Sequence, residues 1–148
     1  DLQGRGGRDP GVRQVRVLMV LDASALLAVL FREEGYEELL EELRRTRPHK
    51  VAAPTLAEAG IVLGARLGFE RVHLLFELLT ELQAEIVPFT ERHAREAISA
   101  YRRYGRGRHP AGLNFGDCLS YALARVEGEP LLYKGQDFDR TDLAWKPS

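Results

Sequence analysis

The first feature of the chain is a short apolar run over residues 17–21, which contains two valines and no polar residue. A run that is apolar at every position is typical of a strand covered on both faces. A carboxylate, Asp22, follows directly, and the next apolar segment, over residues 25–31, is long enough and rich enough in Leu and Ala for a helix. The pattern therefore predicts a buried strand that leads into a helix at Asp22, the position where open α/β sheets bind their ligands.

The remaining hydrophobic pattern alternates between helix-like and strand-like segments. Apolar residues recur at helical spacing over residues 36–45, 54–67, 70–84, 91–104 and 116–126, with Pro48, Gly68 and Thr90 at boundaries between them. Short apolar runs over residues 50–53, 85–89 and 131–133 fit strands. This alternation predicts an α/β protein with three layers, α/β/α, around a central parallel sheet.

The length and composition fit one domain. The chain has 148 residues, 45% of them hydrophobic, which is enough for a single core. Residues 1–16 contain four Gly, four Arg and few apolar side chains, so we expect a disordered arm or a non-native extension before a domain over residues 17–145. No apolar run approaches the ~20 residues of a membrane span. The single cysteine, Cys118, suits a reducing cytoplasm.

The charge balance offers no general attraction to nucleic acid, because the formal net charge is −1. Binding of that kind would have to come from a local patch. One candidate patch runs from the end of a predicted helix into the loop that follows, and consists of Arg102, Arg103, Arg106 and Arg108. We expect Arg106 and Arg108 to contact phosphates, with a solvated surface as the alternative.

Acidic residues occupy equivalent places along the predicted fold. Asp22 follows the first strand, Glu58 lies in the first turn of the helix after the second strand, and Asp117 lies in the first turn of the helix before the last strand. If the sheet is parallel, these positions share one edge. Carboxylates gathered there would repel one another unless a divalent cation neutralises them. Oxygen ligands without clustered Cys or His favour Mg²⁺ or Mn²⁺ over zinc.

A fourth acid would come from the segment after the last strand, where three are available. Asp137 lies about four residues beyond the strand, and each residue can carry the chain up to ~3.5 Å further. We therefore expect Asp137 to complete the site, with Asp142 second and Asp139, on the opposite face of an extended segment, third. Phe138 is expected to anchor this loop in the core.

Structural roles can also explain these acids. Thr55 and Glu58 have the T-x-x-E spacing of a capping box, and Asn114 and Asp117 have a similar spacing. An acid in a first helical turn is in any case favoured by the helix dipole. Asp22 fits a purely structural role least well, since a carboxylate after a buried strand is costly unless it is paired or bound to metal. Ser24 can donate one hydrogen bond to it.

Four segments resemble the acidic motifs of PIN-domain nucleases, in particular the VapC-like toxins of toxin–antitoxin pairs. They are VLDASALLAVL, APTLAEAGIVL, LNFGDCLSYALA and LLYKGQDFDRTDLA. Any one motif is weak, but four in this order at these spacings are highly specific. The resemblance covers roughly residues 19–144.

The resemblance implies a metal-dependent endoribonuclease of α/β/α architecture, usually dimeric and held inactive by a co-expressed antitoxin. Matched by position, the family's metal-binding acids correspond to Asp22, Glu58, Asp117 and Asp137. Its polar helpers, which we expect to contact substrate, correspond to Ser24 and Asn114. The cofactor so implied is Mg²⁺ or Mn²⁺. The implied partners are an RNA substrate, a cognate antitoxin and a second copy of the chain.

Two other functions are weighed against this one. The first is a catalytically silent PIN-fold binding module, which the retention of all four acids disfavours. The second is a receiver-like protein phosphorylated on Asp22, which the absence of an acid directly before Asp22, and of a D-x-D pair, disfavours. The four histidines are scattered and none is assigned a catalytic role. Cys118 is expected to be a small core residue.

Overall fold

The computed structural model describes residues 18–144, and its centre is a four-stranded parallel sheet. The strands are β1 (Met19–Leu21), β2 (His49–Ala52), β3 (Ala84–Val87) and β4 (Leu131–Leu132), in the order β3-β2-β1-β4. In the register, Val20 lies opposite Lys50 on one side and Leu131 on the other. Because β4 returns to the free side of β1, the strand order reverses between these two strands.

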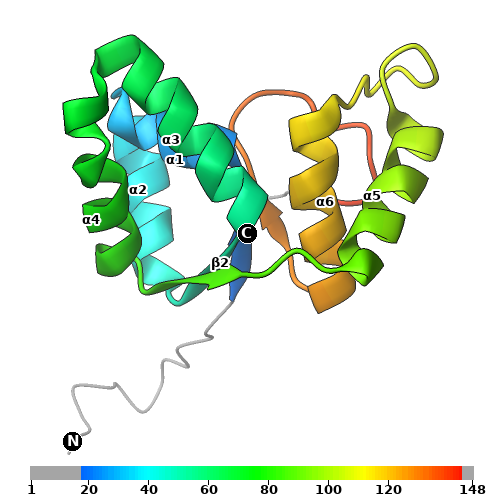
Figure 1. Cartoon of the computed structure of the whole chain (residues 1–148), viewed down its shortest axis with the longest axis horizontal. Helices are drawn as coiled ribbons and strands as arrows, with labels where there is room; N and C mark the ends of the chain where they lie inside the picture. The colour runs from blue at the N-terminus through cyan, green and yellow to red at the C-terminus, as the bar shows by residue number, and fades with distance from the viewer. Residues whose placement is uncertain (1–17, 145–148) are drawn as a thin grey trace, which may run out of the picture.

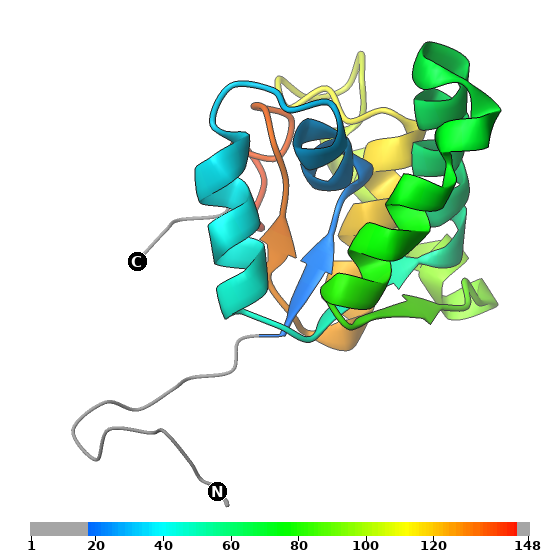
Figure 2. The same cartoon turned by 90° about the vertical axis from the view of Figure 1, so that its left-hand side faces the viewer.

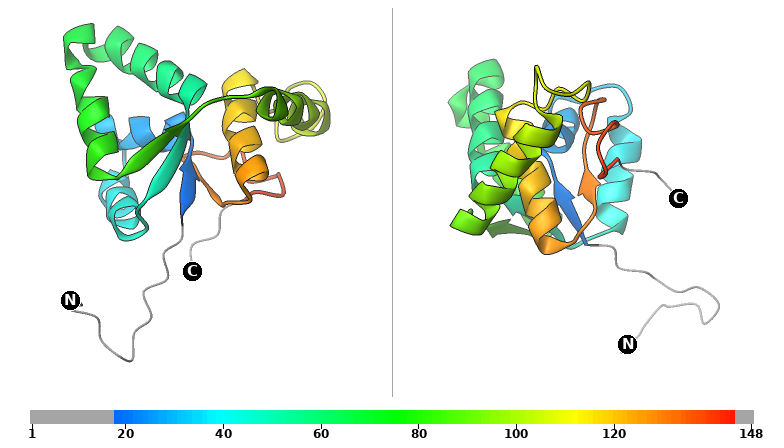
Figure 3. Two further views of the ribbon diagram at one scale, coloured as in Figure 1. Left: turned by 60° about the horizontal axis from the view of Figure 1, so that its bottom comes forward. Right: turned by 90° about the vertical axis from the view of Figure 1, so that its right-hand side faces the viewer.

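Helices cover both faces of the sheet. The elements α1 (Ala23–Leu30), α2 (Tyr36–Arg45), α3 (Ala53–Leu67), a 3₁₀ turn η1 (Phe69–Arg71) and α4 (His73–Glu81) lie on one side, and α5 (Glu91–Tyr104) and α6 (Phe115–Glu127) on the other (Figure 1). Figure 3 shows α5 and α6 in front of the strands when the molecule is seen from their side. The predicted three-layer α/β/α fold with a central parallel sheet is confirmed.

The first strand contributes to two cores, as the run of apolar residues predicted. Met19 and Leu21 pack with α1 to α4, whereas Val20, between them, packs with α5 and α6 on the other face. All three side chains are buried. The alternation of side chains along a strand explains why every position of this strand is apolar.

The carboxyl ends of β1 and β4 lie side by side, and both strands point toward the first turn of α1 (Figure 2). Asp22 leaves β1 at this edge, and the segment that carries Asp137 leaves β4. The Lys134 backbone N–H donates a 3.0 Å hydrogen bond to Ser24 Oγ, which connects the segment after β4 to the first turn of α1. The reversal of strand order thus brings residues more than a hundred positions apart to one point.

Two predicted helices, over residues 36–45 and 91–104, have the limits expected from the sequence. The helix predicted over residues 70–84 is wrong at its end, because α4 stops at Glu81 and Ala84 begins β3. Gln83 adopts a left-handed conformation with φ of 54°, which terminates the helix and reverses the chain into the strand. Apolar periodicity alone does not reveal this reversal, because Leu82 is buried and continues the helical stripe.

The predicted arm over residues 1–16 lies outside the described residues, as do residues 17 and 145 at the two limits of the predicted domain. Among residues 18–144, no helix is both long and apolar enough to pass through a bilayer.

Candidate active site

Asp22 is the buried centre of the candidate site, with 5% of its surface exposed. Its Oδ2 accepts the Ser24 backbone N–H at 3.1 Å and the Ser24 hydroxyl at 2.6 Å, so Asp22 also caps α1. Its Oδ1 accepts the Ser120 hydroxyl at 2.6 Å. The expected Ser24 contact is therefore present. All of these donors are neutral, and they orient the carboxylate without neutralising it.

Ser120 is a site residue that was not predicted from the sequence. It lies on α6, one turn after Asp117, and its hydroxyl is also 3.4 Å from Thr55 Oγ1. A polar residue in a helix whose neighbours from Cys118 to Ala124 are all buried was the available signal. A buried hydroxyl needs a partner, and the partner here is 98 positions away in the sequence.

Asp117 lies at the start of α6 and is held by a reciprocal pair of hydrogen bonds with Asn114. The Asn114 N–H donates to Asp117 Oδ2 at 3.0 Å, and the Asp117 N–H donates to Asn114 Oδ1 at 2.8 Å. The capping-box interpretation of this pair is therefore correct. Burial nevertheless raises the pKa of Asp117 to about 7; the Asn114 hydrogen bond opposes the rise, and the carboxyls of Asp137 and Asp22 add to it.

Glu58 reaches the same place from α3. The helix begins at Ala53, directly after β2, so Glu58 lies in its second turn and the predicted first-turn position is wrong. The Thr55–Glu58 capping box is also wrong, because Ala52 is the N-cap and no side chain caps this helix. Among the residues that the structure describes, none is a hydrogen-bond partner of the buried Glu58 Oε1. Burial, and then the charge of Asp22, raise the pKa of Glu58.

The backbone of α6 makes room for the Glu58 carboxyl. A Cβ atom placed on Gly116 would lie 2.6 Å from Glu58 Oε2, closer than such atoms approach in proteins. The absence of a side chain at position 116 therefore allows Glu58 to lie against the first turn of α6, beside Asp117.

The three acids after β4 have different surroundings. Asp139 accepts the Tyr133 hydroxyl at 2.7 Å, and Asp142 accepts the Tyr121 hydroxyl at 2.7 Å and pairs with Arg125. Asp137 is the acid of this segment whose carboxyl acts on Asp117. Phe138 is 1% exposed and anchors the segment in the core, as expected.

The four acids fit a divalent cation in their chemistry and charge. None of the ion pairs formed within residues 18–144 involves Asp22, Glu58, Asp117 or Asp137. The unpartnered Glu58 oxygen and the raised pKa values of Glu58 and Asp117 indicate negative charge that lacks a counterion. Within the same residues, no three Asp, Glu, His or Cys side chains are already placed to hold a metal ion. Enclosing a cation therefore requires at least one of these carboxyls to rotate.

The basic loop lies beside this edge. Arg106 and Arg108 are exposed on the loop after α5, where the Arg106 N–H bonds to Leu113 O and Arg108 Nε donates to Arg102 O at 3.2 Å. The loop borders the Asp137 segment across a polar pocket of about 450 Å³ lined by Pro110, Ala111, Gln136, Asp137, Asp139 and Arg140. Arg140 is a further basic side chain at the site that was not predicted from the sequence.

Cys118 is a small core residue, as expected, and His49 and His93 have structural contacts. Cys118 is 3% exposed, and burial raises the pKa of its thiol to about 11, which keeps it protonated. His49 is buried and bonds to Leu43 O at 2.8 Å, and burial lowers its pKa. His93 caps α5 together with Thr90.

The comparisons with known proteins agree with this geometry. The PIN domain family matches residues 19–143. The ribonuclease VapC28 of Mycobacterium tuberculosis is 44% identical over 126 residues, which are 84% of this chain and 95% of the relative.

Among solved structures, the sarcin–ricin loop cleaving toxin VapC20 of Mycobacterium tuberculosis is similar in fold, with a TM-score of 0.69 and 16% identity over 87% of this chain and 99% of that one. VapBC2 of Rickettsia felis, bound to a DNA fragment from its promoter, gives a TM-score of 0.65 at 16% identity, over 85% of this chain and 94% of that one. By the family match and the 44% identity, this chain belongs to the PIN-domain family and groups with its VapC ribonucleases.

Proposed function

We propose that this chain is a metal-dependent endoribonuclease, the toxin of a toxin–antitoxin pair, and that it hydrolyses phosphodiester bonds in RNA. Its curated relatives are named ribonucleases. The single observation that carries the proposal is the buried Asp22, whose donors within residues 18–144 are all neutral and which lies beside two further acids with raised pKa values. A receiver-like role fits poorly, because both Asp22 oxygens are occupied by serine hydroxyls. RNA as the substrate and a buried, reduced Cys118 favour the cytoplasm.

In this proposal Asp22, Glu58, Asp117 and Asp137 hold Mg²⁺ or Mn²⁺. When bound, the ion polarises the scissile phosphate and lowers the pKa of the attacking water. Ser24 and Ser120 fix the orientation of Asp22. Asn114, expected to contact substrate, has its side-chain oxygen engaged by Asp117, so its contribution is to position that acid. In many metal sites, residues that hydrogen-bond to a metal ligand without touching the metal fix the orientation of that ligand.

Two further partners belong to the proposal. The antitoxin would inhibit by placing a basic side chain over the acids, since a guanidinium can bridge two carboxylates. Support for such a partner comes from the solved relatives of similar fold, one of which is described as a toxin–antitoxin complex from Klebsiella pneumoniae.

A homodimer would form on an apolar groove of about 580 Å³ between α5 and α6, where Ile98 is 71% and Phe115 76% exposed.

The first prediction concerns the acids. Asp22→Asn and Asp137→Asn should each reduce RNA cleavage by about a hundredfold or more, because each loses a charged metal ligand. Asp139→Asn removes the same charge from the same segment and should cleave nearly as well as wild type. Cleavage is measured with Mg²⁺, with Mn²⁺ and with chelator. Chelator-insensitive cleavage, or full activity of Asp22→Asn, would refute the assignment of a metal-dependent nuclease. If the wild type does not cleave RNA, the catalytically silent binding module is the function that remains.

The second prediction concerns the pH dependence of stability. Asp117 has a pKa of about 7 in the folded chain, against a usual value of 3.8, so the folded state binds the extra proton. Its contribution to stability is fully present below pH 3.8 and is lost as the pH rises to about 7.

Without metal, the wild-type free energy of unfolding should therefore fall over this range relative to Asp117→Asn, which keeps an oxygen for the Asn114 N–H. Denaturant unfolding at a series of pH values checks this. Added Mg²⁺ should reduce the fall, and Asp139→Asn should retain it. Parallel curves for wild type and Asp117→Asn would contradict the electrostatic argument.

The third prediction concerns the basic loop. Replacing Arg106 and Arg108 together by Ala should weaken RNA binding and lower the slope of log affinity against log salt by about 0.7 for each phosphate that the loop no longer neutralises. The matched control replaces Arg44 and Arg45 on α2, which removes the same charge from the other layer and should leave the slope unchanged. Binding is measured by fluorescence anisotropy at several salt concentrations. Equal slopes for both double variants would identify the loop as a solvated surface.

The fourth prediction concerns the dimer. Ile98→Asp should yield monomers, because it buries a charge in the proposed apolar interface. Phe76→Asp, at a 52% exposed apolar residue on α4, should leave the dimer intact. Light scattering after size-exclusion chromatography measures the molar mass and so the oligomeric state. A monomeric wild type or a dimeric Ile98→Asp would refute this interface.

A further inference from the structure

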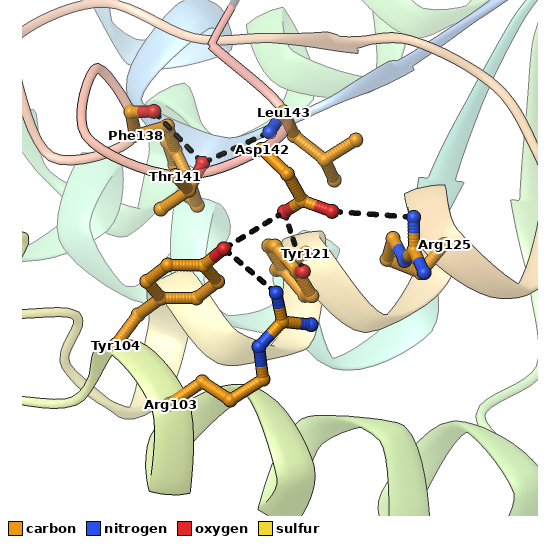
Figure 4. A network of polar contacts seen from close by, with 8 residues as sticks. All are labelled: Arg103, Tyr104, Tyr121, Arg125, Phe138, Thr141, Asp142 and Leu143. Atoms are coloured by element: carbon orange, nitrogen blue, oxygen red, sulfur yellow. Dashed lines mark hydrogen bonds and ion pairs between the residues drawn. The ribbon is translucent and has the colours of Figure 1, made fainter.

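The segment that carries Asp137 is fastened to the helical layer at its far end. Asp142 Oδ1 accepts the Tyr121 hydroxyl at 2.7 Å and the Tyr104 hydroxyl at 3.5 Å, and Asp142 Oδ2 pairs with Arg125 at 3.2 Å (Figure 4). Arg103 in turn donates to the Tyr104 hydroxyl at 2.9 Å. We call the contacts of Asp142 with Tyr121, Tyr104 and Arg125 the Asp142 clasp.

Tyr121 is the buried member of the clasp. Its side chain is fully buried, whereas the acceptor Asp142 is exposed, so the bond is partly shielded from competing water. A hydrogen bond to a carboxylate is also stronger than one between two neutral groups. The clasp therefore differs from the contact of Asp139 with Tyr133, which is exposed and joins two residues of the same segment.

Helix α6 sets the distance between the clasp and the acids. Asp117, Tyr121 and Arg125 are spaced four residues apart, so they follow one another along one side of the same helix. The helix end that presents Asp117 to the site is thus rigidly connected to the two residues that hold Asp142. Fixing Asp142 on α6 fixes the end of the Asp137 segment relative to Asp117.

Contacts within the segment transmit this constraint to Asp137. The Thr141 hydroxyl donates to Phe138 O at 2.8 Å, the Asp139 N–H donates to Gln136 O at 3.1 Å, and Phe138 is inserted into the core. Five residues in extended form could span about 17 Å, so a free end would allow Asp137 many positions. The turns and the clasp together leave it beside Asp117.

We propose that Asp142 is a positioning residue for the metal site: the Asp142 clasp holds the segment after β4 so that Asp137 faces Asp117. This inference rests on the proposed function, because it assigns Asp137 to the metal. It gives Asp142, five residues after Asp137, a role that comes from its contacts with Tyr121, Tyr104 and Arg125.

The test compares two tyrosine variants that each remove one hydroxyl donor to an acid of this segment. Tyr121→Phe breaks the clasp, and Tyr133→Phe breaks the contact with Asp139 while keeping the ring contact with Phe138. Asp142→Ala, which removes both acceptor oxygens, is the second clasp variant, in case Tyr121→Phe folds poorly. The readouts are amide hydrogen exchange over residues 136–143, the Mg²⁺ concentration for half-maximal cleavage, and kcat at saturating Mg²⁺.

For Tyr121→Phe and Asp142→Ala we expect exchange in this segment to be about fivefold faster and the Mg²⁺ midpoint to rise about fivefold, the effect of removing roughly one hydrogen bond. High Mg²⁺ should restore most of kcat, because the ligands themselves are intact. Tyr133→Phe should change neither quantity by more than about twofold.

The outcomes separate the two claims. If wild type cleaves RNA with Mg²⁺ but Tyr121→Phe and Asp142→Ala keep the wild-type midpoint, the positioning role of Asp142 is refuted and the proposed nuclease function is not. A lower kcat that Mg²⁺ does not restore, or an equal effect of Tyr133→Phe, refutes it as well, since a purely structural role predicts both. Absence of metal-dependent cleavage by wild type refutes the proposed function itself, and the positioning role with it.

Discussion

The burial of one carboxylate at the end of β1 governs the arrangement around it. Asp22 can lie there because Ser24 and Ser120 donate to its two oxygens, and these bonds bind α1 and α6 to the same point of the sheet. Neutral donors satisfy the oxygens but leave the charge in place. The fold therefore keeps a negative charge in its interior at the edge where the strand order reverses.

The neighbouring acids add to that charge. Glu58 and Asp117 both have raised pKa values, and in each case burial is the main cause and the charge of Asp22 contributes. Holding these groups together costs stability, and a divalent cation at this place would offset that cost. Gly116 shows how closely the site is assembled, since a single methyl group there would displace Glu58.

Helix α6 is the element on which the site is organised. Its first turn carries the Asn114–Asp117 pair, its next residues supply Ser120 to Asp22 and Tyr121 to Asp142, and Arg125 continues the same side. One rigid helix thus relates the acid after β1, the acid at its own start and the segment after β4. This explains why α6 is buried along most of its length although it bears several polar side chains.

The sequence alone determined the features that depend on local pattern. The apolar run before Asp22 predicted a strand buried on both faces, helical periodicity placed the limits of α2 and α5, and the spacing of Asn114 and Asp117 predicted a cap that the structure contains. The four motifs also indicated the family. Each of these signals lies within a few residues of chain, where backbone geometry and side-chain direction are fixed by the element itself.

Tertiary structure alone decided the rest. Ser120 donates a hydrogen bond to Asp22, 98 positions away in the sequence. Asp142 contacts Tyr121 and Arg125. Glu58 lies a turn later in its helix than expected, because α3 starts directly after β2. Short-range patterns carry no information about which distant side chain will supply a donor. That choice follows from how α3, α6 and the segment after β4 pack around one sheet edge, and it exists only once they are packed.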